Sequence, residues 1–421
     1  MPTRPLSFCM VTTFYPPHHF GGDATYVHRL SNELARRGHR VTVVCSPDAF
    51  STLGGSAGPS PFEHENVLVR PVEGRLGIAS PLVTYLTGRP GLRARSLKRL
   101  LEGERFDVIH FHNVSLVGGP GVLSYGDAVK LYTTHEHWLV CPMHVLWRND
   151  REPCEQPKCL RCTLAFHRPP QLWRYTSLLE RQTRQVDLFL APSEFTIRMH
   201  RERGFSRPMR HLPLFLPRAA QASPDAAPPG DSPRPYFLVV GRLEKLKGVQ
   251  TLIELFSRYD AADLVVVGDG THGTELRRQA KGLRQIRFLG SVPFTQLAPL
   301  YAGAIAVIAA SVGYETFGMT VLEGFAQRTP AVVRELGALP ELVEDSGGGL
   351  TFGTDAELLE ALEALRTDPG LRAELGQRGY EAYVARWSED PHLETYFGLI
   401  DEVLLSREAG SSTRSPVSAD L

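Results

Sequence analysis

The chain has little that would carry it to nucleic acid or across a membrane. Its 46 lysines and arginines are matched by 46 aspartates and glutamates, so no overall basic field attracts nucleic acid. Nowhere do 18 apolar residues follow one another, and the N-terminus has too short an apolar run and too many prolines for a secretory signal. We therefore expect no nucleic-acid partner and a cytoplasmic protein, with any membrane contact limited to the inner face.

The length of the chain and one proline-rich segment predict two domains. The 421 residues exceed the size at which a single core keeps growing. Residues 219–235 carry five prolines among alanines and small polar residues, without any apolar period, which is typical of a linker. We expect an N-terminal domain over 1–218, a C-terminal domain over 236–385, helices over 386–410 that pack back toward the N-terminal domain, and a disordered tail over 411–421.

Both halves begin with the same alternation of strands and helices. The first strand, Phe8 to Thr13, is followed by a helical pattern and by a second strand, Val41 to Cys45. The second half repeats this with strands at Tyr236 to Val240 and Leu264 to Gly268. Such β-α-β units form doubly wound, mostly parallel sheets, whose ligands lie beyond the carboxyl ends of the strands. The fold class is therefore α/β, with two Rossmann-like domains facing each other across a cleft.

The most informative stretch runs from Tyr314 to Glu323. A buried strand precedes it and a short helix begins within it, so free backbone N–H groups form a seat for phosphate at Gly318, Met319 and Thr320. Glu315 lies above that seat, and Glu323 lies one to two turns along the helix. The two carboxylates can then accept hydrogen bonds from hydroxyls at opposite ends of one ligand, which is the pattern of a sugar nucleotide. The alternative is a solvated helix residue at Glu323 and an ordinary loop charge at Glu315.

Cations and glycines at two loops favour a diphosphate ligand. Arg242 and Lys247 lie between a strand end and a helix start, bracketed by glycines, where they can stabilise the charge of a departing diphosphate. In the first half, Gly21 and Gly22 follow a Pro-Pro turn and precede a helix, which lets the backbone approach the diphosphate from the opposite wall. The alternatives are solvated loop charges and a glycine turn that only connects two elements.

A competing motif, G-x-G-x-x-G, stands at 268–273 after a strand. The dinucleotide fingerprint also needs an acidic residue at the end of the next strand, and there the chain reads Gly290-Ser291-Val292. A nicotinamide enzyme is therefore disfavoured and no organic cofactor is expected. We interpret Asp269 and Gly270 as a loop beside the nucleotide.

Several motifs in register resemble the retaining glycosyltransferases of family four. They cover nearly the whole chain in order and lie at residues 14–22, 37–43, 241–248 and 314–323. The resemblance implies a GT-B architecture of two facing Rossmann-like domains. It also implies a nucleotide-diphosphate sugar donor held mainly by the second domain, an acceptor held mainly by the first, and no catalytic divalent metal.

The resemblance assigns roles to individual residues. It implies that Arg242 and Lys247 bind the diphosphate, Glu323 the ribose hydroxyls and Glu315 the donor sugar, and that His135 lies near the reacting face of that sugar. The sequence supplies no persuasive nucleophile for retention. The resemblance implies front-face attack, in which the departing diphosphate helps to deprotonate the acceptor hydroxyl.

The expected function is thus transfer of a hexose to a hydroxyl of a glycan, lipid-linked or secondary-metabolite acceptor. Two alternatives stay open: a nucleotide-sugar processing enzyme of the 2-epimerase type on the same scaffold, and a catalytically silent sugar-nucleotide-binding protein. The first should carry a proton-handling acid in the cleft, and none is found by spacing. The second is disfavoured because the charged residues of the site are all present.

Four of the six cysteines crowd into an insertion over about 138–170, at Cys141, Cys154, Cys159 and Cys162. Four thiolates, two of them at C-x2-C spacing, can bind structural Zn²⁺ in a segment poor in apolar residues. Disulfides, disfavoured in a reducing cytoplasm, an iron–sulfur cluster and free thiols are the alternatives.

A second stretch bears on the acceptor. Basic residues interleave with leucines between Arg75 and Leu100, so an amphipathic face there can contact anionic lipid. Because prolines and glycines interrupt the stretch, a solvated helix that covers the sheet is the preferred interpretation.

Overall fold

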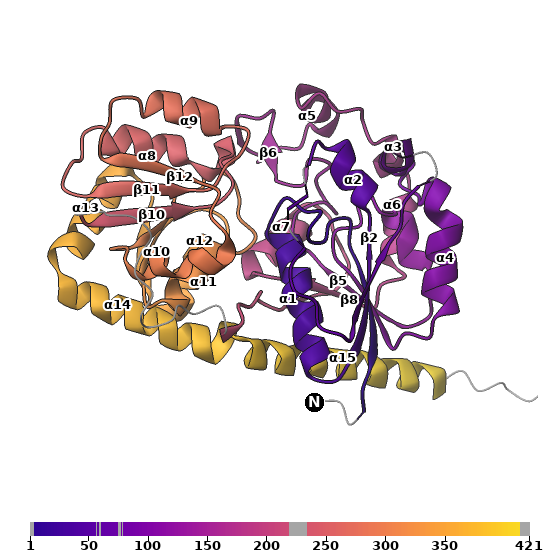
Figure 1. Cartoon of the computed structure of the whole chain (residues 1–421). Helices are drawn as coiled ribbons and strands as arrows, with labels where there is room; N and C mark the ends of the chain where they lie inside the picture. The colour runs from indigo at the N-terminus through magenta and orange to yellow at the C-terminus, as the bar shows by residue number, and fades with distance from the viewer. Residues whose placement is uncertain are drawn as a thin grey trace, which may run out of the picture.

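Two parallel β-sheets form the framework of the computed structural model, which describes residues 4–55, 57–58, 60–74, 77, 79–218 and 234–412. Helices cover both faces of each sheet, and the two layered bodies stand side by side (Figure 1). The α/β class and the two Rossmann-like domains predicted from the sequence are confirmed. Of the predicted linker, residues 219–233 lie outside the described residues, as does the predicted tail over 413–421.

The N-terminal sheet has seven parallel strands in the order β3-β2-β1-β4-β5-β8-β9. In that order the strands are Val67–Pro71, Arg40–Cys45, Ser7–Val11, Val108–Phe111, Val129–Thr133, Leu188–Ala191 and Met209–His211. The central strands are buried on both faces, which explains their continuous apolar runs. The strand order reverses between β1 and β4, so a crevice opens there at the carboxyl ends.

The C-terminal sheet repeats the plan with six parallel strands in the order β12-β11-β10-β13-β14-β15. These are Ile286–Gly290, Asp263–Val267, Tyr236–Val240, Val307–Ala309, Ala331–Arg334 and Gly349–Phe352. Its order reverses between β10 and β13. The strand expected before Tyr314 is β13, and it is shorter than the apolar run that predicts it. A turn at 303–305 closes the preceding helix and delays the start of the strand.

Helices connect the strands in each body. In the N-terminal body they are α1 (Gly22–Arg36), α2 (Pro47–Thr52), α3 (Ala79–Thr87), α4 (Ala94–Gly103), α5 (Cys159–Ala165), α6 (Leu178–Thr183) and α7 (Glu194–Glu202), with a hairpin β6 (Trp147–Arg148) and β7 (Glu152–Pro153). In the C-terminal body they are α8 (Val249–Phe256), α9 (Gly273–Gln279), α10 (Ala298–Ala302), α11 (Met319–Ala326), α12 (Leu339–Ser346), α13 (Asp355–Thr367) and α14 (Pro369–Ala382).

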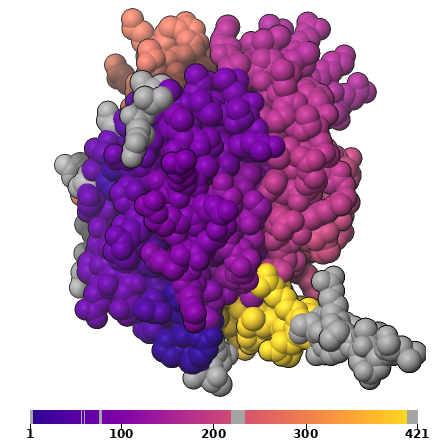
Figure 2. Space-filling model, turned by 90° about the vertical axis from the view of Figure 1, so that its right-hand side faces the viewer, coloured from indigo at the N-terminus to yellow at the C-terminus, as the bar shows by residue number. Residues whose placement is uncertain are grey.

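The last helix joins the two bodies. After a π-helical turn at Tyr383–Trp387, α15 (Glu389–Ser412) runs beneath the N-terminal sheet (Figure 1). Figure 2 shows its end against the lower edge of the N-terminal body. There Arg407 pairs with Asp187 at 2.6 Å, and the buried Phe397 packs edge-on against Phe8 with ring centroids 6.4 Å apart. The helix continues to Ser412, so it includes the first two residues of the expected tail.

This packing makes Phe397 a test of the inter-domain tie. Replacing it with Ala removes a fully buried ring between Phe8 and His39, so we expect a loss of about 3 to 5 kcal/mol in the free energy of unfolding. Denaturant unfolding measures it. The control Leu405→Ala, at a leucine of α15 that is 67% exposed, should change stability by less than about 0.5 kcal/mol. Equal effects of the two substitutions would contradict the role of α15.

Candidate active site between the two sheets

The two crevices of the sheets face each other, and their loops come into contact. Gly21 follows β1, and Arg242 follows β10. A Cβ atom at Gly21 would lie 3.7 Å from Nε of Arg242, so this glycine brings the backbone of one body directly against a cation of the other. A Cβ at Gly22 would meet nothing within 4 Å, so space does not demand glycine there.

Lys247 and Glu315 form the centre of the C-terminal wall. The ammonium of Lys247 lies 2.6 Å from Oε1 of Glu315, and the hydroxyl of Ser311 donates to the same oxygen at 2.5 Å. Burial raises the pKa of Glu315, but the ion pair with Lys247, the bond from Ser311 and the charge of Arg242 together lower it by more. Glu315 therefore stays ionised at neutral pH and holds Lys247 in place.

Gly248 makes this arrangement possible. Its φ is +74°, in the left-handed region, and a Cβ there would lie 1.9 Å from the carbonyl oxygen of Ala310. Only glycine lets the short 3₁₀ turn Lys245–Lys247 lie directly against the end of β13.

The loop of Asp269 and Gly270, which the sequence predicts beside the nucleotide, lies against Leu243, the residue after Arg242. The backbone N–H of Leu243 donates to the carbonyl of Asp269 at 3.0 Å, and a Cβ at Gly270 would lie 2.7 Å from the carbonyl oxygen of Leu243. The carboxylate of Asp269 accepts from the N–H of Gly270 at 2.9 Å. This loop therefore forms one side of the C-terminal wall.

The start of α11 lies at the same edge of the sheet. Gly318 is its N-cap, and Gly318, Met319 and Thr320 are all partly exposed there. Further along α11, Glu323 is held by protein groups. The hydroxyl of Tyr301 donates to it at 2.7 Å, and the guanidinium of Arg29, from α1 of the other body, lies 3.6 Å away. Burial raises the pKa of Glu323 above its ordinary value, and these two partners offset only part of the shift.

His135 lies on the N-terminal wall among aromatic groups. Its Nε2 shares a proton with Nδ1 of His112 at 2.9 Å, and its ring centroid is 5.0 Å from that of Tyr26. Its carbonyl accepts a hydrogen bond of 2.8 Å from the hydroxyl of Thr316 in the opposite body. Nδ1 of His135 is buried and has no hydrogen-bond partner among the described residues.

Sequence reasoning missed three charged or polar members of this site. Asp23, in the first turn of α1, lies beside Gly21, and its charge counteracts the lowering of the pKa of His135. Its position directly after Gly21 and Gly22 could have identified it from the sequence. Arg29 and Tyr301 had no such signal, because their helices show only ordinary amphipathic patterns; the contact of Arg29 with Glu323 depends on how the two bodies pack, and that of Tyr301 on how α10 packs against α11.

The cysteines of the insertion lie near one another, in a cluster that also contains Ala338 and contacts Tyr314 of the C-terminal body. Cys141, Cys154 and Cys162 are buried in one apolar cluster with residues of α7, and none of the four forms a disulfide. Sγ of Cys162 accepts the N–H of Asn149 at 3.3 Å. Among the described histidines, cysteines and acids, no group of three is arranged to hold a metal ion.

Comparison with known proteins identifies the family. The profile of "Glycosyltransferase Family 4" matches residues 20–216, and that of "Glycosyl transferases group 1" matches 234–368. The chain belongs to the family-four glycosyltransferases. This glycosyltransferase is 28% identical to a glycogen synthase of Mycobacterium tuberculosis (strain ATCC 25618 / H37Rv) over 98% of this chain and 97% of that protein. It is 30% identical to the lipopolysaccharide core biosynthesis glycosyltransferase LpsE of Rhizobium meliloti (strain 1021), over 47% of this chain and 59% of that protein.

Solved structures confirm the GT-B fold of this glycosyltransferase. A sucrose-phosphate synthase from Thermosynechococcus elongatus superimposes with a TM-score of 0.72 at 19% identity, over 95% of this chain and all of that one. Anabaena Alr3699/HepE, solved in complex with UDP and glucose, gives a TM-score of 0.67 at the same identity and coverage. Across the described part of the glycosyltransferase, the helices fall short of the length and apolar character that a bilayer crossing requires.

The buried histidines predict how stability depends on pH. Burial lowers the pKa of His135 from 6.5 to about 4, so between these values the folded protein binds fewer protons than the unfolded chain. The neutral, buried imidazole of His135 makes its full contribution to stability above 6.5, its pKa in the unfolded chain. That contribution is lost as the pH falls toward about 4, its pKa in the folded protein. We expect His135→Asn to lose less stability than the parent between about pH 7 and about pH 5 in urea unfolding.

The exposed His167, replaced by Asn, is the matched control. An identical pH dependence in the parent and in His135→Asn would show that His135 titrates normally.

Proposed function

We propose that this glycosyltransferase moves a hexose from a nucleoside diphosphate sugar to an acceptor hydroxyl, with retention of the anomeric configuration. The observation that carries the proposal is the approach of Gly21 to Arg242, next to the ion pair of Lys247 with Glu315. A guanidinium, an ammonium and the N-terminus of α11 at one edge of the sheet provide the donors that a departing diphosphate requires. The solved relative with bound UDP and glucose is consistent with such a donor.

The residues of the site suit a front-face reaction. The bond from the anomeric carbon to the diphosphate oxygen breaks, the acceptor oxygen bonds to the same face of that carbon, and the acceptor proton passes to the leaving diphosphate. Glu315 is already bonded to Lys247 and Ser311, which favours an orienting role over a nucleophilic one. His135 is neutral at physiological pH, so its Nδ1 can hydrogen-bond a sugar hydroxyl without competing for the proton.

The acceptor is proposed to be a polyhydroxyl compound of glycan, glycolipid or secondary-metabolite assembly, held at the rim of the N-terminal sheet. The curated relatives act in glycogen and lipopolysaccharide core synthesis, which is compatible with that class. We place the reaction in the cytoplasm, at or near the inner face of the membrane, without a catalytic divalent metal.

Two rival functions make different predictions. A nucleotide-sugar epimerase of the 2-epimerase type would change the donor sugar without any acceptor. A silent binding protein would bind the donor without turnover. Incubation with a nucleotide sugar, with and without acceptor, separates them, because only a transferase releases nucleoside diphosphate in step with a glycosylated product.

Removal of either cation should affect the chemical step. We expect Arg242→Ala and Lys247→Ala each to lower turnover roughly a hundred- to a thousandfold, about 3 to 4 kcal/mol in activation free energy, because each removes a preorganised partner of the leaving group. Steady-state kinetics of diphosphate release measures this. Lys281→Ala, at an exposed lysine after α9, should leave the rate unchanged. A near-normal rate in either site variant would refute the assignment.

The two glutamates should separate binding from transfer. Glu323→Gln should weaken the binding of the sugar nucleotide and of the free nucleoside diphosphate to the same extent, since the ribose is present in both. Glu315→Gln should reduce transfer more than nucleotide affinity, because Glu315 positions Lys247 and the sugar. Calorimetry and kinetics of both variants, with the exposed Glu254→Gln as control, test the division. Equal losses of nucleotide affinity at the two positions would contradict it.

We also propose, as a separate point, that Cys141, Cys154, Cys159 and Cys162 bind structural Zn²⁺. Their common location in one insertion supports the proposal, although the thiols would have to turn toward a common centre. Metal analysis of protein purified without chelator decides between zinc and free thiols.

A further inference from the structure

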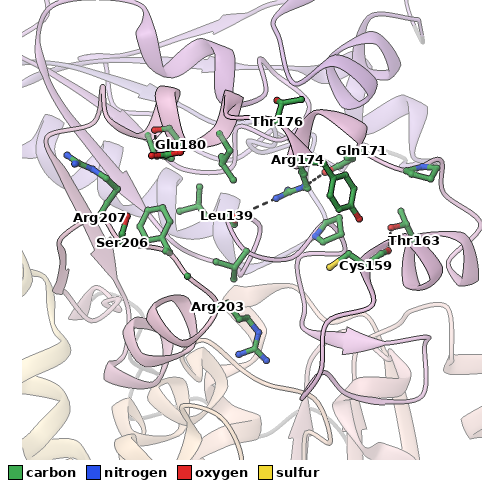
Figure 3. A pocket seen from close by; sticks show the side chains of 18 of the residues that line it. Leu139, Cys159, Thr163, Gln171, Arg174, Thr176, Glu180, Arg203, Ser206 and Arg207 are labelled. Carbon is green, nitrogen blue, oxygen red and sulfur yellow. Dashed lines mark hydrogen bonds between the residues drawn. The ribbon is translucent and has the colours of Figure 1, made fainter.

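One element of the Cys-rich insertion, the hairpin of β6 and β7, reaches from the N-terminal body to the C-terminal one. Elsewhere the insertion faces its own body: α5, with Cys159 and Thr163, lines a cavity of about 490 Å³ there (Figure 3). Figure 1 shows β6 where the two bodies adjoin. The hairpin is therefore the part of the insertion whose contacts with the C-terminal body need an explanation.

The residues of the hairpin give it a defined shape. Its two strands are antiparallel, and the guanidinium of Arg148 lies 2.5 Å from the carboxylate of Glu152 directly across from it. Asn149 and Asp150, at the tip, have φ values of +52° and +57°, a left-handed conformation that these two residue types tolerate better than most. The tip is thus a tight turn with one preferred geometry.

The tip holds the turn that carries Lys247. The ammonium of Lys245 donates to the backbone carbonyl of Asp150 at 2.9 Å. Lys245 is the first residue of the 3₁₀ turn that ends at Lys247. A backbone group of the N-terminal body therefore fixes one end of a turn in the donor site.

Trp147, next to the tip, packs where this turn meets the loop of Glu315. The carbonyl of Leu246 accepts the N–H groups of Val312 and Gly313 at 2.8 and 3.1 Å. A Cβ at Gly313 would lie 3.0 Å from Cβ of Leu246 and 3.5 Å from Cε3 of Trp147, whose side chain is only 4% exposed. Nε1 of Trp147 is buried and has no hydrogen-bond partner among the described residues, so packing holds the ring.

The base of the hairpin reaches the backbone of Glu315. Leu146 and Cys154 lie in an apolar cluster that also contains Ala338, and Tyr314 packs against this cluster. The N–H of Ala338 donates to the carbonyl of Glu315 at 3.1 Å. The insertion thus contacts the segments of both members of the ion pair in the donor site.

We propose that the hairpin positions Lys247 and Glu315, with Trp147 and the backbone of Asp150 as positioning residues for the transfer reaction. The inference rests on the roles proposed above for Lys247 and Glu315. Their charged groups lie 2.6 Å apart, and this distance depends on how the 3₁₀ turn sits against the loop. Without the indole ring the turn and the loop can shift, and a displacement of about 1 Å can lower a rate about a hundredfold.

Substitutions in the hairpin test this role without touching the C-terminal body. Trp147→Ala should lower kcat about tenfold to a hundredfold and leave the affinity for free UDP nearly unchanged. Trp147→Phe keeps most of the packing and leaves no indole N–H unpaired, so it should restore most of the rate. Asp150→Pro, whose ring fixes φ at about −65°, should also slow transfer, whereas Asp150→Gly keeps the left-handed turn and its carbonyl and should not.

A double-substitution cycle separates positioning from a general loss of structure. Glu315→Gln already releases Lys247, so adding Trp147→Ala to it should lower kcat little further. Added to Glu323→Gln, the same substitution should multiply the two losses, because Glu323 lies on α11 and pairs with Arg29 instead.

The outcomes distinguish this inference from the proposed function. Multiplied losses in the double variant with Glu315→Gln, or a normal rate in Trp147→Ala, would overturn the inference and leave the role of Lys247 standing. A near-normal rate in Lys247→Ala would overturn both. Circular dichroism melting checks the fold of each variant. If Trp147→Ala melts early, the two variants of Asp150 decide: equal rates in them overturn the inference, and a slower rate in Asp150→Pro supports it.

Discussion

The geometry of the active site depends on one inter-domain contact, the bond from Thr316 to His135. The hydroxyl of Thr316 donates to the carbonyl of His135 at 2.8 Å, and the carbonyl of Thr316 accepts from Ser193 at 2.8 Å. These bonds hold the loop of Glu315 against the ends of β5 and β8. They therefore help to set the spacing between the two walls.

Other contacts reinforce this closure at both sides of the cleft. Glu341 of α12 accepts the N–H groups of Glu194 and Phe195 at 3.0 and 2.6 Å, so a carboxylate of one body satisfies the start of α7 in the other. On the opposite side, Arg29 reaches Glu323. The ribose role proposed for Glu323 therefore requires Arg29 to share this carboxylate, and donor binding would be coupled to the contact between the two bodies.

The sequence predicted the parts of the fold that local patterns determine. Apolar runs indicated the strands because parallel strands are buried on both faces. Gly248 indicated a loop, and its backbone there has a left-handed conformation that favours glycine. The charged partners Lys247 and Glu315 were found because both stand next to glycine-bearing strand ends. Arg29 could not be found because its contact with Glu323 crosses the domain boundary, and Tyr301 could not be found because it meets Glu323 only through the packing of α10 against α11. The glycosyltransferase family and the GT-B fold could thus be predicted from motifs, whereas the side chains that meet Glu323 could be placed only with the structure.

Hydrogen exchange with and without UDP tests most directly the claim that the diphosphate lies between both walls. The account predicts slower exchange on the N-terminal wall at Gly21 and Gly22 and on the C-terminal wall at 242–248 and 318–320, all in the same titration. Protection confined to the C-terminal segments, with unchanged exchange at Gly21 and Gly22, would contradict it.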